Sequence, residues 1–290
     1  MSASVVVVGS LHYDIMVDAP DRPRKGETVA GRSWAPKFGG KGGNQAAAAR
    51  SQGAETAMVG AVGNDDFGTA LLAGLDKARV DRSAVAVLPG VGSGMSVAIF
   101  DDDGDYGAVI VSGANLALQA DQASDALLRG AKVLVLQNEI PEAVNAEVAR
   151  RARALGAKVI LNAAPARPFA TALSGFVDML VVNAIEAEML GAAPVNALAD
   201  AERAADTLAA RFPAVIVTAG GDGVAYRDAR ERFAFAAIPV AVESTHGAGD
   251  MFVGTLAARL AAGDAIQEAL EAANREAAKL VATPEVERGV

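Results

Sequence analysis

The chain has 290 residues, of which 52% are hydrophobic and 4% aromatic, and its formal net charge is −9. This length and composition allow one large folded domain with a sizeable core and exclude a disordered chain. Sequence-independent nucleic-acid binding needs clustered Lys and Arg, and no basic run occurs. There is no cysteine, which excludes disulfides, thiolate catalysis and zinc sites built on cysteine.

The first ten residues, MSASVVVVGS, have no basic stretch, and their run of four valines is too short for a signal peptide. No segment reaches the roughly 18 apolar residues of a membrane span. We therefore expect a cytoplasmic protein whose partners are small molecules, with neither nucleic acid nor a membrane among them.

Short β-branched runs alternate with amphipathic segments along most of the chain. The runs predict buried strands at Val5–Val8, Ala57–Val62, Lys132–Leu136, Lys158–Leu161, Met179–Val182 and Ala214–Thr218. The amphipathic segments predict helices near 43–52, 66–78, 141–155, 184–190 and 197–211, and two more after 249 and 264. Asp264 and Gln267 have the spacing of a capping box for the last helix. This alternation predicts a mostly parallel sheet with helices on both faces, a three-layer α/β/α fold.

Two regions depart from this alternation. Residues 10–38 contain three prolines and no helical stripe, and the alternating runs 95–100 and 106–111 flank the turn DDDGD. The second pattern predicts a β-hairpin. We expect one domain over 1–290, with a small antiparallel β lid formed by about 12–38 and 88–112. An edge extension of the main sheet is the alternative.

Two glycine-rich turns could lie against a ligand. In FGGKGGNQAAAAR (38–50), glycines surround Lys41 before a helix, so backbone could approach a ligand beside a positive charge. The spacing is neither a Walker A motif nor G-x-G-x-x-G, and a plain flexible turn is the alternative. VTAGGDGV (217–224) follows a predicted strand and suits either nucleotide contacts or a plain hairpin.

Acidic side chains follow several predicted strands, where ligands bind in open parallel sheets. Asp14 in GSLHYD could accept hydrogen bonds from substrate hydroxyls, or could cap a turn. Glu139 ends another strand. Asn183 and Glu186 lie at i and i+3 as a helix begins, a spacing that could hold a hydrated Mg²⁺ and equally suits helix capping by Asn183.

The stretch ESTHGAGDMF (243–252) places three small residues before an aspartate. Gly247, Ala248 and Gly249 would present backbone N–H groups at the start of a helix, where the helix dipole favours an anion. Asp250 could then accept a proton from an attacking hydroxyl as general base. With a metal ion on the phosphates, these are the parts that phosphoryl transfer needs.

Taken together, eight motifs between about residues 4 and 282 resemble the ribokinase-like (PfkB) family of carbohydrate kinases. They are GSLHYD, GETVAG, FGGKGGNQA, VGNDDFG, LNAAPAR, NAIEAE, VTAGGDGV and THGAGD. The resemblance implies an enzyme that uses Mg²⁺ and ATP and transfers the γ-phosphate to a primary hydroxyl of a small sugar, with D-ribose as the leading substrate. It also implies a β-sheet lid through which such enzymes commonly form homodimers.

The resemblance further assigns roles to single residues. Asp250 corresponds to the catalytic base, and Gly247, Ala248 and Gly249 to the anion hole. The sugar-binding positions correspond to His12, Asp14, Gly40, Lys41, Asn44 and Glu139. The nucleotide-binding positions correspond to Asn183, Thr218, Gly220, Gly223 and Asn274, and Glu186 corresponds to the residue that holds Mg²⁺ through water.

The chain departs from the family pattern at a few positions. Ser244 replaces an aspartate of the monovalent-cation site, and VATPEVERGV does not resemble the family's cation-binding loop, which argues against activation by K⁺. His12 replaces an asparagine that contacts the sugar, so a nucleoside or another pentose or hexose is an alternative substrate.

Two other classes of function are alternatives. A dinucleotide-dependent oxidoreductase would need G-x-G-x-x-G after the first strand, which Gly9–His12 does not supply. A catalytically silent sugar-binding protein on the same fold is the second alternative; the intact GAGD and NAIE motifs argue against it, and the altered cation site argues for it.

Overall fold

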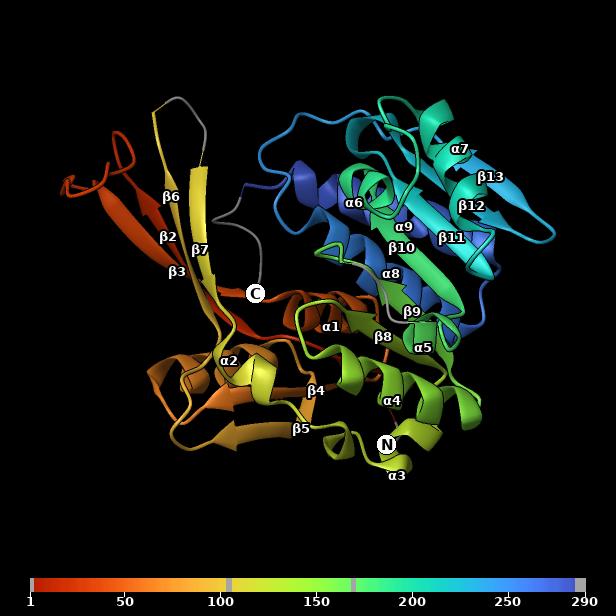
Figure 1. The fold of residues 1–290 in the computed structure, drawn as a ribbon, viewed down its shortest axis with the longest axis horizontal. Coiled ribbons are helices and arrows are strands. Elements are labelled where there is room, and N and C mark those ends of the chain that lie inside the picture. The colour runs from red at the N-terminus through yellow and green to blue at the C-terminus, as the bar shows by residue number, and fades with distance from the viewer. Residues whose placement is uncertain (1–2, 103–105, 168–170, 285–290) are drawn as a thin grey trace.

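The computed structural model describes residues 3–102, 106–167 and 171–284. In this part of the chain, the larger sheet has nine strands in the order β13-β12-β11-β10-β9-β8-β1-β4-β5 (Figure 1). The strands are β1 (Val5–Val8), β4 (Thr56–Gly63), β5 (Asp81–Leu88), β8 (Val133–Gln137), β9 (Lys158–Asn162), β10 (Met179–Asn183), β11 (Ala214–Thr218), β12 (Val224–Asp228) and β13 (Arg232–Phe235). All pairs are parallel except β11–β12 and β12–β13. The six predicted strands are confirmed, with ends that differ by at most one residue.

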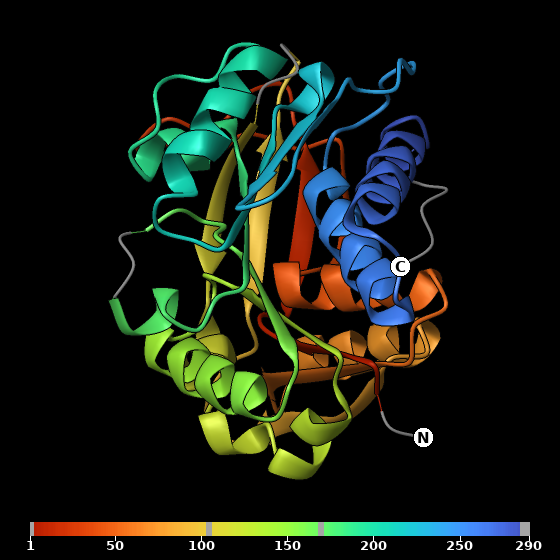
Figure 2. The same ribbon diagram turned by 90° about the vertical axis from the view of Figure 1, so that its right-hand side faces the viewer.

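Helices cover both faces of this sheet (Figures 1 and 2). One face carries α3 (Asp125–Gly130), α4 (Glu142–Ala154), α5 (Thr171–Ser174), α6 (Ala184–Met189) and α7 (Leu198–Leu208). The other carries α1 (Lys41–Ser51), α2 (Asp66–Lys77), α8 (Ala248–Ala262) and α9 (Ile266–Val281). In β1, Val6 and Val8 belong to the first apolar cluster, whereas Val5 and Val7 belong to the second. A strand buried on both faces explains the unbroken apolar run, and the predicted three-layer α/β/α fold is confirmed.

The predicted capping box at the start of α9 is wrong. The helix begins after Ala265, and no side chain caps it. The Asp264 carboxylate instead pairs with Arg259 at the end of the preceding helix, at 2.5 Å between Oδ2 and Nε. Gln267 donates its amide to Glu271 one turn further on (3.1 Å). An ion pair to a neighbouring helix therefore takes the side chain that local spacing assigned to the cap.

A second, smaller sheet extends from the main body (Figure 1). Its strand order is β3-β2-β6-β7, formed by β3 (Ser33–Gly39), β2 (His12–Asp18), β6 (Met95–Phe100) and β7 (Tyr106–Val111). The outer pairs are antiparallel, and the central pair β2–β6 is parallel. The predicted second sheet and its hairpin are confirmed, although residues 103–105 of the DDDGD turn lie outside the described residues. Because the two sheets are separate, the small one is not an edge extension of the large one.

The order of the strands shows where a ligand would bind. From β1 the chain builds the sheet outward through β4 and β5, and then returns to add β8, β9, β10 and β11 on the other side of β1. In open α/β sheets, ligands bind at the carboxyl ends of the strands beside such a reversal. Gly9 and Ser10 follow β1 at this point, and Glu139 follows β8. Among the described residues, no helix combines the length and the apolar character needed to cross a membrane.

Candidate active site

The helix α8 begins at the site with open backbone donors. Gly247, its N-cap, has φ = 79°, a left-handed conformation that favours glycine, and no side chain caps the helix. The N–H of Ala248 donates to the carbonyl of Thr245 (3.2 Å), so one of the three predicted anion-hole donors is engaged. In the described part of the chain, no acceptor takes the N–H groups of Gly247 and Gly249. Two donors therefore remain at the positive end of the helix dipole.

Asp250 lies in the first turn of α8 and is only 8% exposed. Two adjacent residues of α1 hold its carboxylate. Asn44 donates through Nδ2 to Oδ2 (3.0 Å), and Gln45 donates through Nε2 to Oδ1 (2.9 Å). Gln45 also donates to Oδ1 of Asn162 (2.9 Å) and accepts from Nε2 of Gln137 (2.7 Å). The carboxylate is thus held by two amides of α1, and the buried amide of Gln45 is in turn held by Asn162 and Gln137.

Sequence reasoning did not select Gln45 or Asn162 as site residues. Both lie inside motifs that carried the family resemblance, FGGKGGNQA and LNAAPAR. The sequence did offer one indication of a role for Gln45, an amide followed by four alanines on a helix that must be buried. A buried amide needs a hydrogen-bond partner, so Gln45 must have one. This pattern does not identify the partner, and in the structure one partner of Gln45 is Asp250, the proposed base.

One cation faces several carboxylates in the site. Burial raises the pKa of Asp250, opposed by the positive charge of Lys41 and by the hydrogen bonds from Asn44 and Gln45. Burial disfavours the ammonium of Lys41, yet attraction to Asp250, Glu139 and Glu186 outweighs this and raises the pKa of Lys41. Lys41 therefore stays charged and compensates the acidic groups around it.

The start of α1 is capped by Glu139. Gly40 precedes the helix with φ = 86°, and a Cβ on it would lie 2.7 Å from the backbone nitrogen of His12. Oε2 of Glu139 accepts the N–H of Lys41 (3.0 Å) and the hydroxyl of Ser10. A carboxylate at a helix N-terminus is favourable because it compensates the helix dipole. Ser10, which was not predicted, joins the end of β1 to this cap.

Asp14 and His12 lie on β2, where the small sheet meets the main body. The hydroxyl of Ser96 on β6 donates to Oδ1 of Asp14. Burial raises the pKa of Asp14, and the Ser96 hydrogen bond opposes this in part. His12 is 4% exposed, and within the described chain its buried Nε2 has no hydrogen-bond partner. Such a group costs about 1–3 kcal/mol unless a partner arrives, so Nε2 fits a ligand hydroxyl.

A cavity of about 190 Å³ adjoins Asp250. Its lining includes seven predicted site residues: Lys41, Asn183, Glu186, Thr218, Gly247, Gly249 and Asp250. Asn183 and Glu186 also form a capping box at the start of α6, with two hydrogen bonds of 2.8 Å between them. Asn183 therefore caps the helix, and both residues of the pair also lie beside the cavity. Burial raises the pKa of Glu186.

Three predicted nucleotide-binding residues do not line this cavity. Gly220 and Gly223 lie in the turn between β11 and β12, which is a hairpin, and have φ values of 54° and 126°. Asn274 on α9 donates to the carbonyl of Ala236 (3.0 Å).

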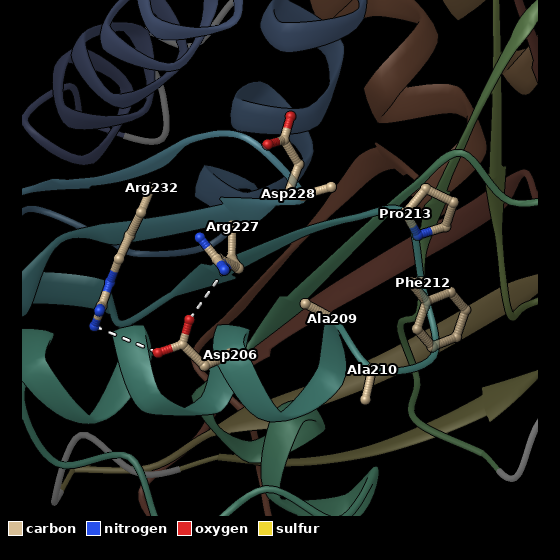
Figure 3. A pocket seen from close by; sticks show the side chains of 9 residues that line it. Asp206, Ala209, Ala210, Phe212, Pro213, Arg227, Asp228 and Arg232 are labelled. Carbon is tan, nitrogen blue, oxygen red and sulfur yellow. Dashed lines mark ion pairs between the residues drawn. The ribbon is translucent and has the colours of Figure 1, made fainter.

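A larger hollow of about 590 Å³ lies between α7 and the strands β12 and β13 (Figure 3). Three of its charged lining residues pair with one another: Asp206 binds Arg227 at 3.3 Å and Arg232 at 3.4 Å. Strands β12 and β13 lie at one edge of the sheet, six and seven places along from β4, and are thus far from the β1–β8 boundary. The smaller cavity beside Asp250 is therefore the candidate active site.

A carboxylate held beside an open helix start, a partly buried lysine and a cavity at the strand reversal define a phosphotransferase that acts on a hydroxyl. The family model described as "pfkB family carbohydrate kinase" matches residues 2–288, so the chain belongs to the pfkB family of carbohydrate kinases. The predicted family and enzyme class are confirmed. The oxidoreductase alternative is wrong, because Gly9–Leu11 lead from β1 into strand β2 and not into a helix.

Ribokinases are among the similar proteins. Ribokinase from Bacillus subtilis is 36% identical over 277 residues, which cover 94% of this chain and 91% of that protein. The structure of Arabidopsis thaliana ribokinase complexed with ribose and ATP matches with a TM-score of 0.90 and 29% identity, covering 98% of this chain and 94% of the other. Ribokinase from Thermotoga maritima matches with a TM-score of 0.88 and 28% identity, covering 97% and 93%.

Proposed function

We propose that the protein is an ATP-dependent kinase that phosphorylates the primary hydroxyl of D-ribose. The observation that carries the proposal is the placement of Asp250 beside the open start of α8, in a cavity that Lys41 and Glu186 also line. The similarity to ribokinases over most of the chain, one of them complexed with ribose and ATP, supports the choice of substrates.

In the proposed reaction, Asp250 accepts the proton of the sugar hydroxyl, and the hydroxyl oxygen forms a bond to the γ-phosphorus of ATP. The bond from that phosphorus to the β–γ bridging oxygen breaks, and ADP leaves. The N–H groups of Gly247 and Gly249, which have no acceptor among the described residues, would stabilise the negative charge on the transferred group. Asn183, Thr218, Gly220, Gly223 and Asn274 are the proposed contacts to the nucleotide.

The residues present fit a magnesium ion held through water. Among the described residues, no group of three His, Asp or Glu side chains could hold a metal alone. Glu186 lines the cavity, and the only hydrogen bond described for its carboxylate involves Oε2, which leaves Oε1 for a hydrated cation. Mg²⁺ commonly binds in this way, through few carboxylates, several waters and substrate phosphates. When bound, it would neutralise charge on the phosphates.

The sugar is proposed to lie between the main body and the small sheet. Asp14, Asn44 and Glu139 supply acceptors and donors for its hydroxyls, Gly40 allows close approach and Lys41 adds a positive charge. The unpartnered Nε2 of His12 supplies one further hydrogen bond. Because Tyr13 of β2 stacks on Phe67 of α2 at 4.4 Å between centroids, the small sheet is joined to the main body at this end. We propose that its outer part serves as a lid that excludes water.

The edge strands of the small sheet carry exposed apolar side chains, which supports a homodimer formed through this sheet. They are Trp34 (64% exposed) on β3 and Val109 (68%), Ile110 (59%) and Val111 (50%) on β7. Exposed apolar side chains on the edge strands of one small sheet favour a protein interface. We also propose activity in the cytoplasm and without K⁺, the latter because Ser244 replaces the expected aspartate.

The proposal is tested by ADP release from MgATP with a panel of pentoses, hexoses and nucleosides, with and without K⁺. We expect the largest kcat/KM for D-ribose and less than about a twofold effect of K⁺. A larger kcat/KM for a nucleoside would change the substrate, and binding of a sugar without any transfer would identify a silent sugar-binding protein.

A further inference from the structure

We propose that Gln45 is a positioning residue that fixes Oδ1 of Asp250 and thereby reserves Oδ2 as the atom that accepts the proton of the substrate. The inference deepens the proposed function and rests on it. It concerns a residue that does not line the cavity and so would not touch the substrate.

All the hydrogen-bonding capacity of the Gln45 amide nitrogen is committed inside the protein. Gln45 is fully buried, and its Nε2 donates to Asp250 Oδ1 and Asn162 Oδ1, both at 2.9 Å. Its Oε1 accepts from Gln137 at 2.7 Å. A primary amide has two N–H donors, so both are used. If the amide group were rotated by half a turn, its oxygen would face two acceptor oxygens, Oδ1 of Asp250 and Oδ1 of Asn162. The surroundings therefore allow only the observed orientation.

The partner of the other carboxylate oxygen is held less firmly. Asn44 is only partly buried, and its amide makes a single described hydrogen bond, the one to Asp250 Oδ2 at 3.0 Å. Its side chain can turn away from Oδ2 without leaving a second partner unsatisfied. An incoming hydroxyl can thus displace Asn44 from Oδ2, whereas it cannot displace Gln45 from Oδ1.

Because Gln45 holds Oδ1 firmly and Asn44 can leave Oδ2, the Asp250 carboxylate has a fixed orientation in which Oδ2 is free to accept a proton. The terminal torsion of an aspartate is broad, so an unrestrained carboxylate would sample orientations that do not face the hydroxyl. Proton transfer requires the acceptor atom to lie within hydrogen-bond distance in a fixed orientation. A hydrogen bond to the ionised carboxylate also favours its charged form. The other charged groups around Asp250 are Lys41 at the start of α1, Glu139 after β8 and Glu186 on α6.

The test compares two substitutions of Gln45 with one control. Gln45→Met keeps the length of the side chain and removes both donors. Gln45→Glu keeps an acceptor for Gln137 and places a second carboxylate against Asp250. The control, Thr255→Val, removes a buried hydroxyl from the same helix as Asp250; among the described residues, the one hydrogen bond of that hydroxyl is to the sulfur of Met251, at 3.7 Å. Each protein is assayed for kcat, sugar KM and the pH profile of kcat/KM, and its unfolding is measured by circular dichroism.

We expect kcat of Gln45→Met to fall about 10- to 100-fold with sugar KM changed less than about threefold, because one hydrogen bond to a charged base is lost. The acid limb of kcat/KM should move to higher pH. Gln45→Glu should lose more activity than Gln45→Met, and Thr255→Val should keep both kcat and the pH profile. Either Gln45 variant that folds is sufficient for the decision.

Two outcomes would overturn the inference, and they are distinguishable from failure of the proposed function. If the unsubstituted protein phosphorylates D-ribose and the Gln45 variants keep kcat within twofold, or lose activity only through KM, Gln45 does not position the base and the proposed function stands. If the unsubstituted protein transfers no phosphate to any acceptor, the proposed function fails and this inference fails with it.

Discussion

Replacement of Asp250 by asparagine separates catalysis from binding and folding. Asparagine has the same shape, and its oxygen can still accept the hydrogen bond from Gln45. Its amide would face Asn44, which can turn because it makes one described hydrogen bond. The structural cost is therefore about one hydrogen bond, near 1 kcal/mol, and it is offset because a buried charge is removed. We expect the Kd of the sugar to change little.

The catalytic cost is much larger. A general base contributes about 10²- to 10⁴-fold, which corresponds to about 3–5 kcal/mol of activation free energy at 1.36 kcal/mol per tenfold change. Stopped assays of ADP release would give kcat, and calorimetry would give Kd. The matched control is Asp66→Asn, an exposed aspartate in the first turn of α2, which should keep full activity. If Asp250→Asn kept kcat within about threefold of the unsubstituted protein, Asp250 would not be the base.

The remaining predictions concern pH, metal and the β11–β12 turn. Because burial raises the pKa of Asp250 and the base must be ionised, kcat/KM should fall as pH decreases, with an acid limb above 3.8; a limb at or below 3.8 would contradict this. Because its pKa is raised, Asp250 binds its proton more tightly in the folded state than in the unfolded state. Protonated Asp250 therefore contributes stability below pH 3.8, and this stability is lost as pH rises through the pKa of the folded state. The Tm of Asp250→Asn relative to the unsubstituted protein should therefore increase over that range, and a constant difference would be evidence against it. Glu186→Gln should raise the Mg²⁺ concentration for half-maximal rate about 10-fold with little change in sugar KM, whereas an unchanged Mg²⁺ titration would exclude Glu186 from metal binding. Gly223→Ala would place a Cβ 2.0 Å from the Phe235 carbonyl at φ = 126°, and should lower the free energy of unfolding by about 1–3 kcal/mol in urea titrations. Gly221→Ala, where a Cβ meets no atom within 4 Å, is the control, and equal losses in the two variants would show that the close contact at Gly223 is not the cause.

The main fold follows from local patterns that survive in the structure. The strands were predictable because β1 and its parallel neighbours are buried on both faces and therefore read as continuous apolar runs. The hairpin of β6 and β7 was predictable from alternation around a turn. The parallel pairing of β2 with β6 was not, because it joins segments about 80 residues apart and depends on how the small sheet closes on the main body.

The candidate site also contains residues that could be predicted from local sequence and residues that could not. Asp250 and the glycines before it were predictable because their chemistry depends on a helix start, which is local. Gln45 and Ser96 were not predicted, because their roles depend on partners that lie 205 and 82 residues away, Asp250 and Asp14 respectively. The engagement of the Ala248 N–H by Thr245 was missed for another reason: it depends on the conformation of the turn, which residue types alone do not determine.

The most direct test of the account is the identity of the product formed from MgATP and D-ribose. Phosphorus NMR of the reaction mixture distinguishes a phosphate monoester on the primary hydroxyl from other esters and from free phosphate. We expect ADP and the primary phosphate ester in equal amounts, at a rate that Asp250→Asn reduces at least about 100-fold. Release of free phosphate without a sugar ester, or an ester formed equally fast by Asp250→Asn, would contradict it.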